Sequence, residues 1–262
     1  MTISLLIKIP SQIVENVSDK SNIGKLALIL VIVRSVFLFL SQVIIALILL
    51  LMNDPNPWEN SFKWYTVYGT ITDIGCLTLI LIFLKQEKKS FWRIINFNYK
   101  RILKDFLVGI LIFLIIFPIT GMLSTIFFSN VIYHGVSLDL LYPGQIVGRV
   151  LPTWAYYYSF IIWWPIWSFI EEMTYQGYSL PRLLIHFKNP FKVILIIGFF
   201  WAFQHCFLPF ILDWRYLLWR LFSFFPLVVC LIFAYLKTGR LVPIIIAHYF
   251  MDIGVVWFTL KH

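Results

Sequence analysis

The chain has 262 residues, of which 61% are hydrophobic and only 13% are charged. A soluble domain is nearer to about 45–50% apolar with about a quarter of its residues charged, so this composition excludes a sizeable soluble domain. The net charge of +9 is not a nucleic-acid signature, because the basic residues concentrate in short connections between apolar segments. We therefore expect membrane lipids as partners and no nucleic acid.

The first segment, residues 3–17, mixes apolar and polar side chains around Pro10 and is compatible with an interfacial helix. No short apolar core with a small-residue cleavage site is present there, so no removable signal peptide is expected. Seven apolar segments follow, each long enough to cross a bilayer as a helix. They occupy roughly residues 26–52, 64–84, 105–128, 153–180, 193–211, 216–236 and 241–259.

These segments predict an all-α, polytopic membrane protein with about seven to eight transmembrane helices in one bundle. No internal repeat is visible, so residues 1–262 are expected to form a single integral membrane domain. The connection at 85–104 is the most basic one and belongs in the cytoplasm under the positive-inside rule. Alternation then places the N-terminus and the other basic connections on the same side. Arg215 and Arg220 fall near the outer boundary, where long side chains can snorkel.

The most unusual feature is a pair of adjacent carboxylates, Glu171 and Glu172, inside an apolar segment. An ionised carboxylate near the bilayer centre costs about 2.5–3.5 kcal/mol, so such a pair predicts a functional site. Two histidines, His205 and His248, lie in equally apolar surroundings. We count residues from each position to the nearest basic connection, which begins at Arg182 for Glu171, and take a rise of about 1.5 Å per residue. Glu171, His205 and His248 then lie roughly 16, 20 and 12 Å from the cytoplasmic edge. Three helices therefore bring a carboxylate and two imidazoles to one layer.

Spacing within each helix adds local detail. Neighbouring helical residues point about 100° apart, so one glutamate is expected to do chemistry while the other makes a structural contact. His248 and Asp252 are i,i+4 partners, so the carboxylate can orient the ring. Further i,i+4 pairs, which could carry buried hydrogen bonds or wall a pocket, are Glu171 with Tyr175, Glu172 with Gln176, and Trp201 with His205.

These residue types predict hydrolysis. A carboxylate can take a proton from water, and imidazoles can complete water activation or bind a developing oxyanion. Alternatively, Glu171, His205 and His248 could hold a divalent metal such as zinc, whose bound water would be the nucleophile. The sequence does not choose between these two arrangements.

The pattern Glu171-Glu172-x-x-x-Gln176, then Trp201-x-x-x-His205, then His248-x-x-x-Asp252, resembles the signature of the CPBP family (CAAX protease and bacteriocin-processing, or Abi). That signature reads EExxxR, FxxxH and HxxxN/D, and the resemblance covers about residues 150–260.

The resemblance implies an intramembrane endopeptidase of about eight helices that acts on a peptide or membrane-protein substrate. By position it implies Glu171 as the water-activating glutamate, His205 and His248 as its partners, and Glu172 as a supporting group. Asp252 would replace the usual Asn, while Gln176, Trp201 and Tyr175 would line the substrate cavity.

Two positions depart from the family pattern. Gln176 stands where the family usually has Arg, so the cation that would balance the glutamate pair is missing from the motif. Trp201 replaces Phe and keeps an aromatic wall. The Gln176 departure leaves a catalytically silent scaffold or immunity protein as one alternative, and a small-molecule transporter is another. Arg34 and Asp73, in the first two spans, are interpreted as an interhelical pair rather than as parts of the site.

Overall fold

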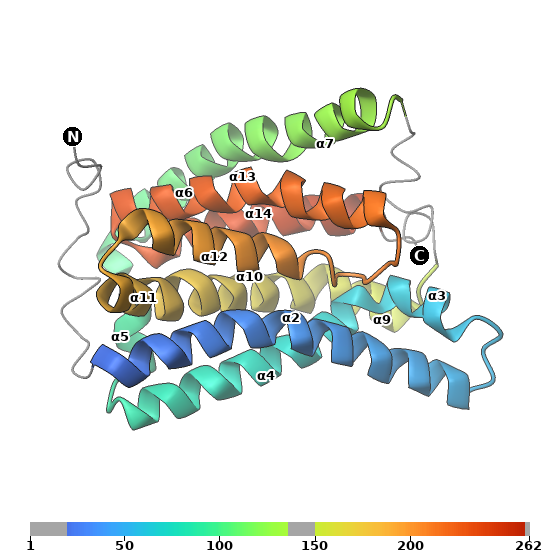
Figure 1. Ribbon diagram of the computed structural model, residues 1–262, viewed down its shortest axis with the longest axis horizontal. Coiled ribbons are helices and arrows are strands. Elements are labelled where there is room, and N and C mark those ends of the chain that lie inside the picture. The colour runs from blue at the N-terminus through green and yellow to red at the C-terminus, as the bar shows by residue number, and fades with distance from the viewer. Residues whose placement is uncertain (1–19, 136–149, 260–262) are drawn as a thin grey trace.

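A computed structural model describes residues 20–135 and 150–259, which form a bundle of helices lying along one another (Figure 1). The described residues contain no β-strand. A segment that stays in lipid must satisfy its backbone hydrogen bonds internally, which a helix does. The interfacial helix expected at residues 3–17 lies outside the described residues.

The elements are α2 (Lys20–Leu51), α3 (Pro57–Ser61), η2 (Phe62–Trp64), α4 (Tyr65–Gln86), α5 (Phe91–Ile95), η3 (Tyr99–Arg101), α6 (Ile102–Ile116), η4 (Phe117–Met122), α7 (Leu123–Phe127), η5 (Phe128–Ile132), α9 (Thr153–Tyr158), η6 (Ser159–Trp163), α10 (Trp164–Glu172), η7 (Met173–Ser179), α11 (Leu180–Phe187), α12 (Pro190–Gln204), α13 (Trp214–Thr238) and α14 (Leu241–Thr259).

Helices lie over all seven predicted segments, with shifted ends. The fifth segment was expected to continue to residue 211, but α12 ends at Gln204. Pro209 follows, and a proline disfavours helical conformation in the residue before it. Four of these helical stretches within the described ranges are long and apolar enough to cross a membrane, namely Asn22–Leu51, Pro57–Gln86, Phe91–Met122 and Trp214–Thr238. That the remaining stretches also cross it stays a prediction.

The outer surface of α2 shows how the bundle meets its surroundings. Ile29, Ile32, Val36 and Leu40 recur every three or four residues and are each more than 40% exposed. Residues at this spacing lie on one helical face. A continuous apolar stripe of this kind is rare on a soluble monomer, and it is compatible with lipid contact. The exposed stripe therefore supports an integral membrane protein.

The segment α10–η7–α11 lies in the middle of the bundle. It packs against α2 and α4 on one side and against α14 on the other. Helix α12 packs between this segment and α13. The outermost helical stretch, α6 to α7, packs on α14 and α13 and lies along one edge of the molecule (Figure 1). Every residue of η7 is buried. Side chains from α2, α4, α12 and α14 can therefore all reach the end of α10.

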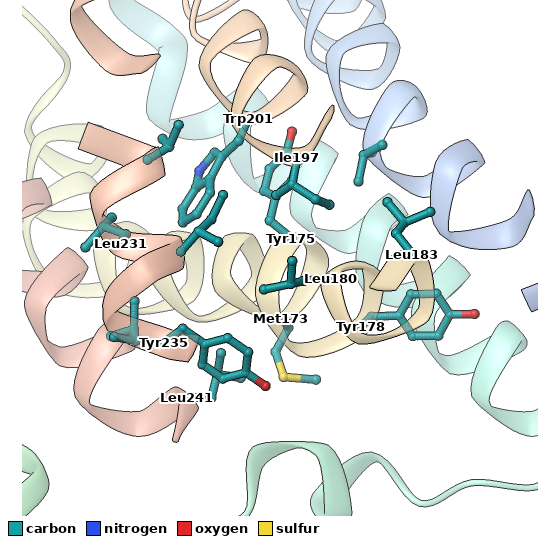
Figure 2. Packing of buried hydrophobic residues seen from close by; sticks show 14 of the residues in the cluster. Met173, Tyr175, Tyr178, Leu180, Leu183, Ile197, Trp201, Leu231, Tyr235 and Leu241 are labelled. Atoms are coloured by element: carbon teal, nitrogen blue, oxygen red, sulfur yellow. The ribbon is translucent and has the colours of Figure 1, made fainter. Parts of the chain in front are cut away.

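Aromatic and aliphatic side chains fill the space around η7. Figure 2 shows Met173 and Tyr175 of η7 among residues of α12 and α13. The rings of Tyr175 and Trp201 are stacked with centroids 5.2 Å apart. Close packing of this kind fixes side-chain directions, so polar groups beside it are held in defined positions.

Two buried ion pairs tie helix ends together. Arg182 of α11 donates from Nε to Glu87, just after α4, at 2.9 Å. Arg240 donates from Nε to Asp105 of α6 at 2.8 Å and from Nη2 to the second carboxylate oxygen. Arg182 was expected in a cytoplasmic connection and served as the membrane edge for Glu171. It instead lies 4% exposed within α11, so it does not mark the end of the helical segment.

Candidate active site

The two adjacent glutamates point to different partners. Glu171 and Glu172 are the last residues of α10, and both are fully buried. Since successive helical side chains diverge by about 100°, the two carboxylates face different helices. Glu171 turns toward α12 and α2, where it meets Trp201 and Arg34. Glu172 turns toward His248 of α14.

Two donors hold Glu171. The indole Nε1–H of Trp201 donates to Oε1, and Nη2 of Arg34 donates to Oε2 at 3.5 Å. Arg34 is itself held by Asp73 of α4, with Nη2 to Oδ1 at 2.9 Å, and by Gln204, with Nε to Oε1 at 2.7 Å. The predicted Arg34–Asp73 interhelical pair is confirmed. The same arginine also contacts Glu171, which that interpretation had excluded.

Glu172, His248 and Asp252 form a second chain. Nδ1 of His248 lies 2.9 Å from Oε1 of Glu172, and Nε2 lies 3.6 Å from Oδ1 of Asp252. A carboxylate accepts hydrogen bonds, so Nδ1 carries a proton in this contact. Asp252 was expected to orient the ring, but the shorter contact comes from Glu172. The imidazole is therefore flanked by carboxylates on both nitrogens.

His205 follows the last residue of α12, where the helix ends. Its Nδ1 lies 2.9 Å from the carbonyl oxygen of Trp201, which can only accept. Nδ1 must then donate, which leaves the lone pair of a neutral ring on Nε2. Phe224 stacks on the ring at 3.7 Å, and Nε of Arg220 donates to the His205 carbonyl at 2.9 Å. Arg220 was expected to snorkel outward, but it is buried because this helix end presents unpaired carbonyls.

Trp201 links the groups of the candidate site. Its ring nitrogen donates to Glu171, its carbonyl accepts from His205, and its ring centroid lies 6.3 Å from that of His248. Its ring also stacks on Tyr175. The sequence predicted an aromatic wall at this position, but the hydrogen bond of the indole nitrogen, which a phenylalanine lacks, was missed.

The i,i+4 hydrogen bonds expected between Glu171 and Tyr175 and between Glu172 and Gln176 are absent among the described residues. The hydroxyl of Tyr175 donates to the carbonyl of Phe200 at 3.3 Å instead of reaching Glu171. Both amide atoms of Gln176 are buried without a hydrogen-bond partner in the described part of the chain. The reason is that η7 is a π-helix, whose wider turn rotates these side chains away from the positions that α-helical spacing predicts.

The geometry gives the metal alternative no support. Within residues 20–135 and 150–259, no three His, Cys, Asp or Glu side chains converge in a way that could hold a metal ion. Glu171 and His248 instead each contact another protein side chain. The residues present do not fit the metal centre that Glu171, His205 and His248 were expected to offer.

The family model for type II CAAX prenyl endopeptidases, Rce1-like, matches residues 152–254. The matched model is one of the CPBP family. No curated protein and no solved structure matches the chain. The CPBP match confirms the family resemblance that the three motifs predicted, and it indicates an intramembrane endopeptidase. All five candidate ionisable residues, from Glu171 to Asp252, lie inside the matched range, whereas Arg34 and Asp73 lie outside it.

Proposed function

We propose that this protein is an intramembrane endopeptidase that hydrolyses a peptide or membrane-protein substrate with activated water. The observation that carries the proposal is the buried contact of each glutamate with a residue of another motif. Glu171 accepts from Trp201, whose carbonyl accepts from His205, and Glu172 contacts His248 directly. The family model that matches residues 152–254 describes type II CAAX prenyl endopeptidases, which supports this proposal.

In the proposed reaction, Glu171 acts as the general base. It takes a proton from water while the water oxygen attacks the carbonyl carbon of the scissile peptide bond. When the tetrahedral intermediate collapses, the C–N bond breaks and the proton held by Glu171 passes to the leaving nitrogen. Trp201 and Arg34 donate hydrogen bonds to Glu171, and these bonds stabilise its carboxylate and fix its direction.

The two imidazoles have different proposed roles because their hydrogen bonds differ. His205 keeps a lone pair on Nε2, which can accept the second hydrogen of the attacking water. Nδ1 of His248 is engaged by Glu172, whereas Nε2 lies 3.6 Å from Asp252, beyond hydrogen-bond distance, so Nε2–H is the proposed donor to substrate. A donor of this kind stabilises the oxyanion that forms on the substrate carbonyl.

Because no three ligands converge among the described residues, cleavage is proposed to need no metal. We expect activity to persist in a strong chelator. Loss of cleavage in chelator with recovery on added zinc would contradict this part of the proposal.

We place the N-terminus and the basic connections on the cytoplasmic side, and we treat residues 1–262 as one membrane domain. The net charge of +9, concentrated in these connections, supports that orientation. Tyr175, Trp201 and Gln176 remain the proposed lining of the substrate cavity.

The test compares membranes that contain the wild-type protein with membranes that contain Glu171→Gln, which preserves side-chain size. Peptide termini mapped by mass spectrometry should include ends that only the wild type produces, which also identifies the substrate. Ser168→Ala is the matched control, because Ser168 is a buried polar residue of the same helix whose hydroxyl donates to the carbonyl of Trp164 in that helix. This control should cleave normally.

If Glu171→Gln produces the same termini as the wild type, the protease proposal fails. A cellular phenotype that survives Glu171→Gln, together with unchanged termini, would instead support the scaffold alternative.

A further inference from the structure

Arg34 lies on α2, far outside the CPBP-matched segment, yet its guanidinium ends beside Glu171. The side chain is fully buried, with the ring of Trp167 at 4.5 Å from its central carbon. A buried cation in an apolar helix is costly unless it is paired. Its position at the candidate base therefore calls for an explanation beyond packing of α2 on α4.

The arginines of the matched segment are all engaged elsewhere. Arg182 pairs with Glu87, Arg215 with Asp213, Arg220 with two backbone carbonyls, and Arg240 with Asp105. Residue 176, where the family pattern has an arginine, is a glutamine without a hydrogen-bond partner in the described residues. Glu171 therefore takes its guanidinium contact from outside the segment that carries the motifs.

We infer that Arg34 is a positioning residue for Glu171, so that α2 and α4 complete the active site that α10–α14 begin. The inference rests on the proposed function. Arg34 uses Nη2 for both carboxylates, at 2.9 Å to Asp73 and 3.5 Å to Glu171. The shorter contact fixes the guanidinium, and Gln204 fixes its Nε. The longer contact orients Glu171 while leaving its oxygen able to take a proton from water.

Asp73 and Glu171 share the charge of Arg34, so the experiment must remove Arg34 without leaving two buried carboxylates unpaired. Removing Arg34 alone would leave both carboxylates buried without a counter-charge and would destabilise the protein. The double variant Arg34→Gln/Asp73→Asn removes cation and anion together, and Asp73→Asn alone is its reference. The two variants differ only in Arg34. Activity is measured on a synthetic peptide spanning the cleavage site identified in the membrane comparison.

We expect kcat of the double variant to fall at least about tenfold below the Asp73→Asn reference, with KM unchanged, as when a group that orients a catalytic residue is lost. The kcat of Arg34→Lys should lie between those of the double variant and of Asp73→Asn. Lysine keeps the charge but lacks the forked guanidinium that reaches Gln204 and both carboxylates. The matched control is Arg240→Gln/Asp105→Asn, which removes another Arg–Asp pair, in which Asp105 is buried and Arg240 is partly buried. Its kcat per folded molecule should equal that of the wild type.

Equal kcat values for the double variant and Asp73→Asn would overturn the inference and leave the proposed function intact. If the double variant does not fold, a kcat of Arg34→Lys equal to the wild-type value overturns it. Failure of the proposed function is recognised separately, because then the wild type itself cleaves no more than Glu171→Gln.

Discussion

Two buried arginines, Arg182 and Arg34, bind carboxylates in opposite ways. Arg182 donates from Nε and Nη2 to Glu87 and from Nη1 to the carbonyl of Tyr178, whose ring also lies against the guanidinium. Every nitrogen of this group is used. Arg34 instead divides one nitrogen between two carboxylates, and its Nη1 has no hydrogen-bond partner among the described residues.

We interpret the Arg182–Glu87 pair as a structural clasp, meaning an ion pair that only holds two helix ends together, and Arg34 as part of the proposed site. Buried polar groups are normally satisfied, so incomplete satisfaction needs a reason such as chemistry or bound water. Within the described residues, Arg34, Gln204, Glu172 and Asp252 each keep a buried side-chain atom without a hydrogen-bond partner, whereas Arg182 and Glu87 keep none; such atoms also occur elsewhere, as on Trp64. Groups that must exchange protons with substrate and water need such open hydrogen-bonding capacity, whereas a clasp between helix ends does not.

The largest predicted effect breaks the clasp. Arg182→Gln leaves Glu87 buried without a cation, and breaking a buried pair costs about 3–5 kcal/mol. Unfolding of the purified protein in detergent should show this loss, while cleavage per folded molecule stays at the wild-type level. The matched control is Arg215→Gln, whose ion pair with Asp213 is exposed and should contribute little. A fall in kcat for Arg182→Gln would contradict the division between clasp and site.

The next effect concerns the donor that Trp201 provides. Trp201→Phe keeps an aromatic ring but removes the N–H that donates to Glu171, so kcat should fall about tenfold, the size of one hydrogen bond to a charged group. The control is Trp163→Phe, because Trp163 is equally buried and its Nε1 has no hydrogen-bond partner in the described residues. If both variants lose activity equally, ring size rather than the hydrogen bond is responsible.

Much of the helical arrangement could be predicted from sequence, because an apolar segment in a membrane satisfies its own backbone hydrogen bonds when it is helical. Helices lie over all seven predicted segments, although the helix in the fifth segment ends early, at Gln204. Their internal register was harder to predict. The π-helical turn of η7 redirects Gln176, and no local sequence signal distinguishes it from a regular helix.

The candidate site was predicted for the same physical reason in each case. Glu171, Glu172, His205 and His248 are ionisable residues in apolar helices, and the energetic cost of such residues in a membrane predicts a function for them. Arg34 and Asp73 carried the same signal and were paired with each other. That Arg34 also reaches Glu171 depends on how α2 packs against α10 and α12, and the sequence of either helix alone does not show it.

The smallest predicted effect concerns two buried glutamines that differ in their partners. Gln204 accepts from Arg34, whereas both amide atoms of Gln176 lack partners within the described chain. An unsatisfied buried polar group costs about 1–3 kcal/mol, so Gln176→Met should unfold at an equal or slightly higher temperature and keep its cleavage rate. Gln204→Met should be less stable, because Arg34 loses its anchor. A loss of cleavage in Gln176→Met alone would show that the amide itself contacts substrate or water, rather than lining the proposed cavity only through the bulk of the side chain.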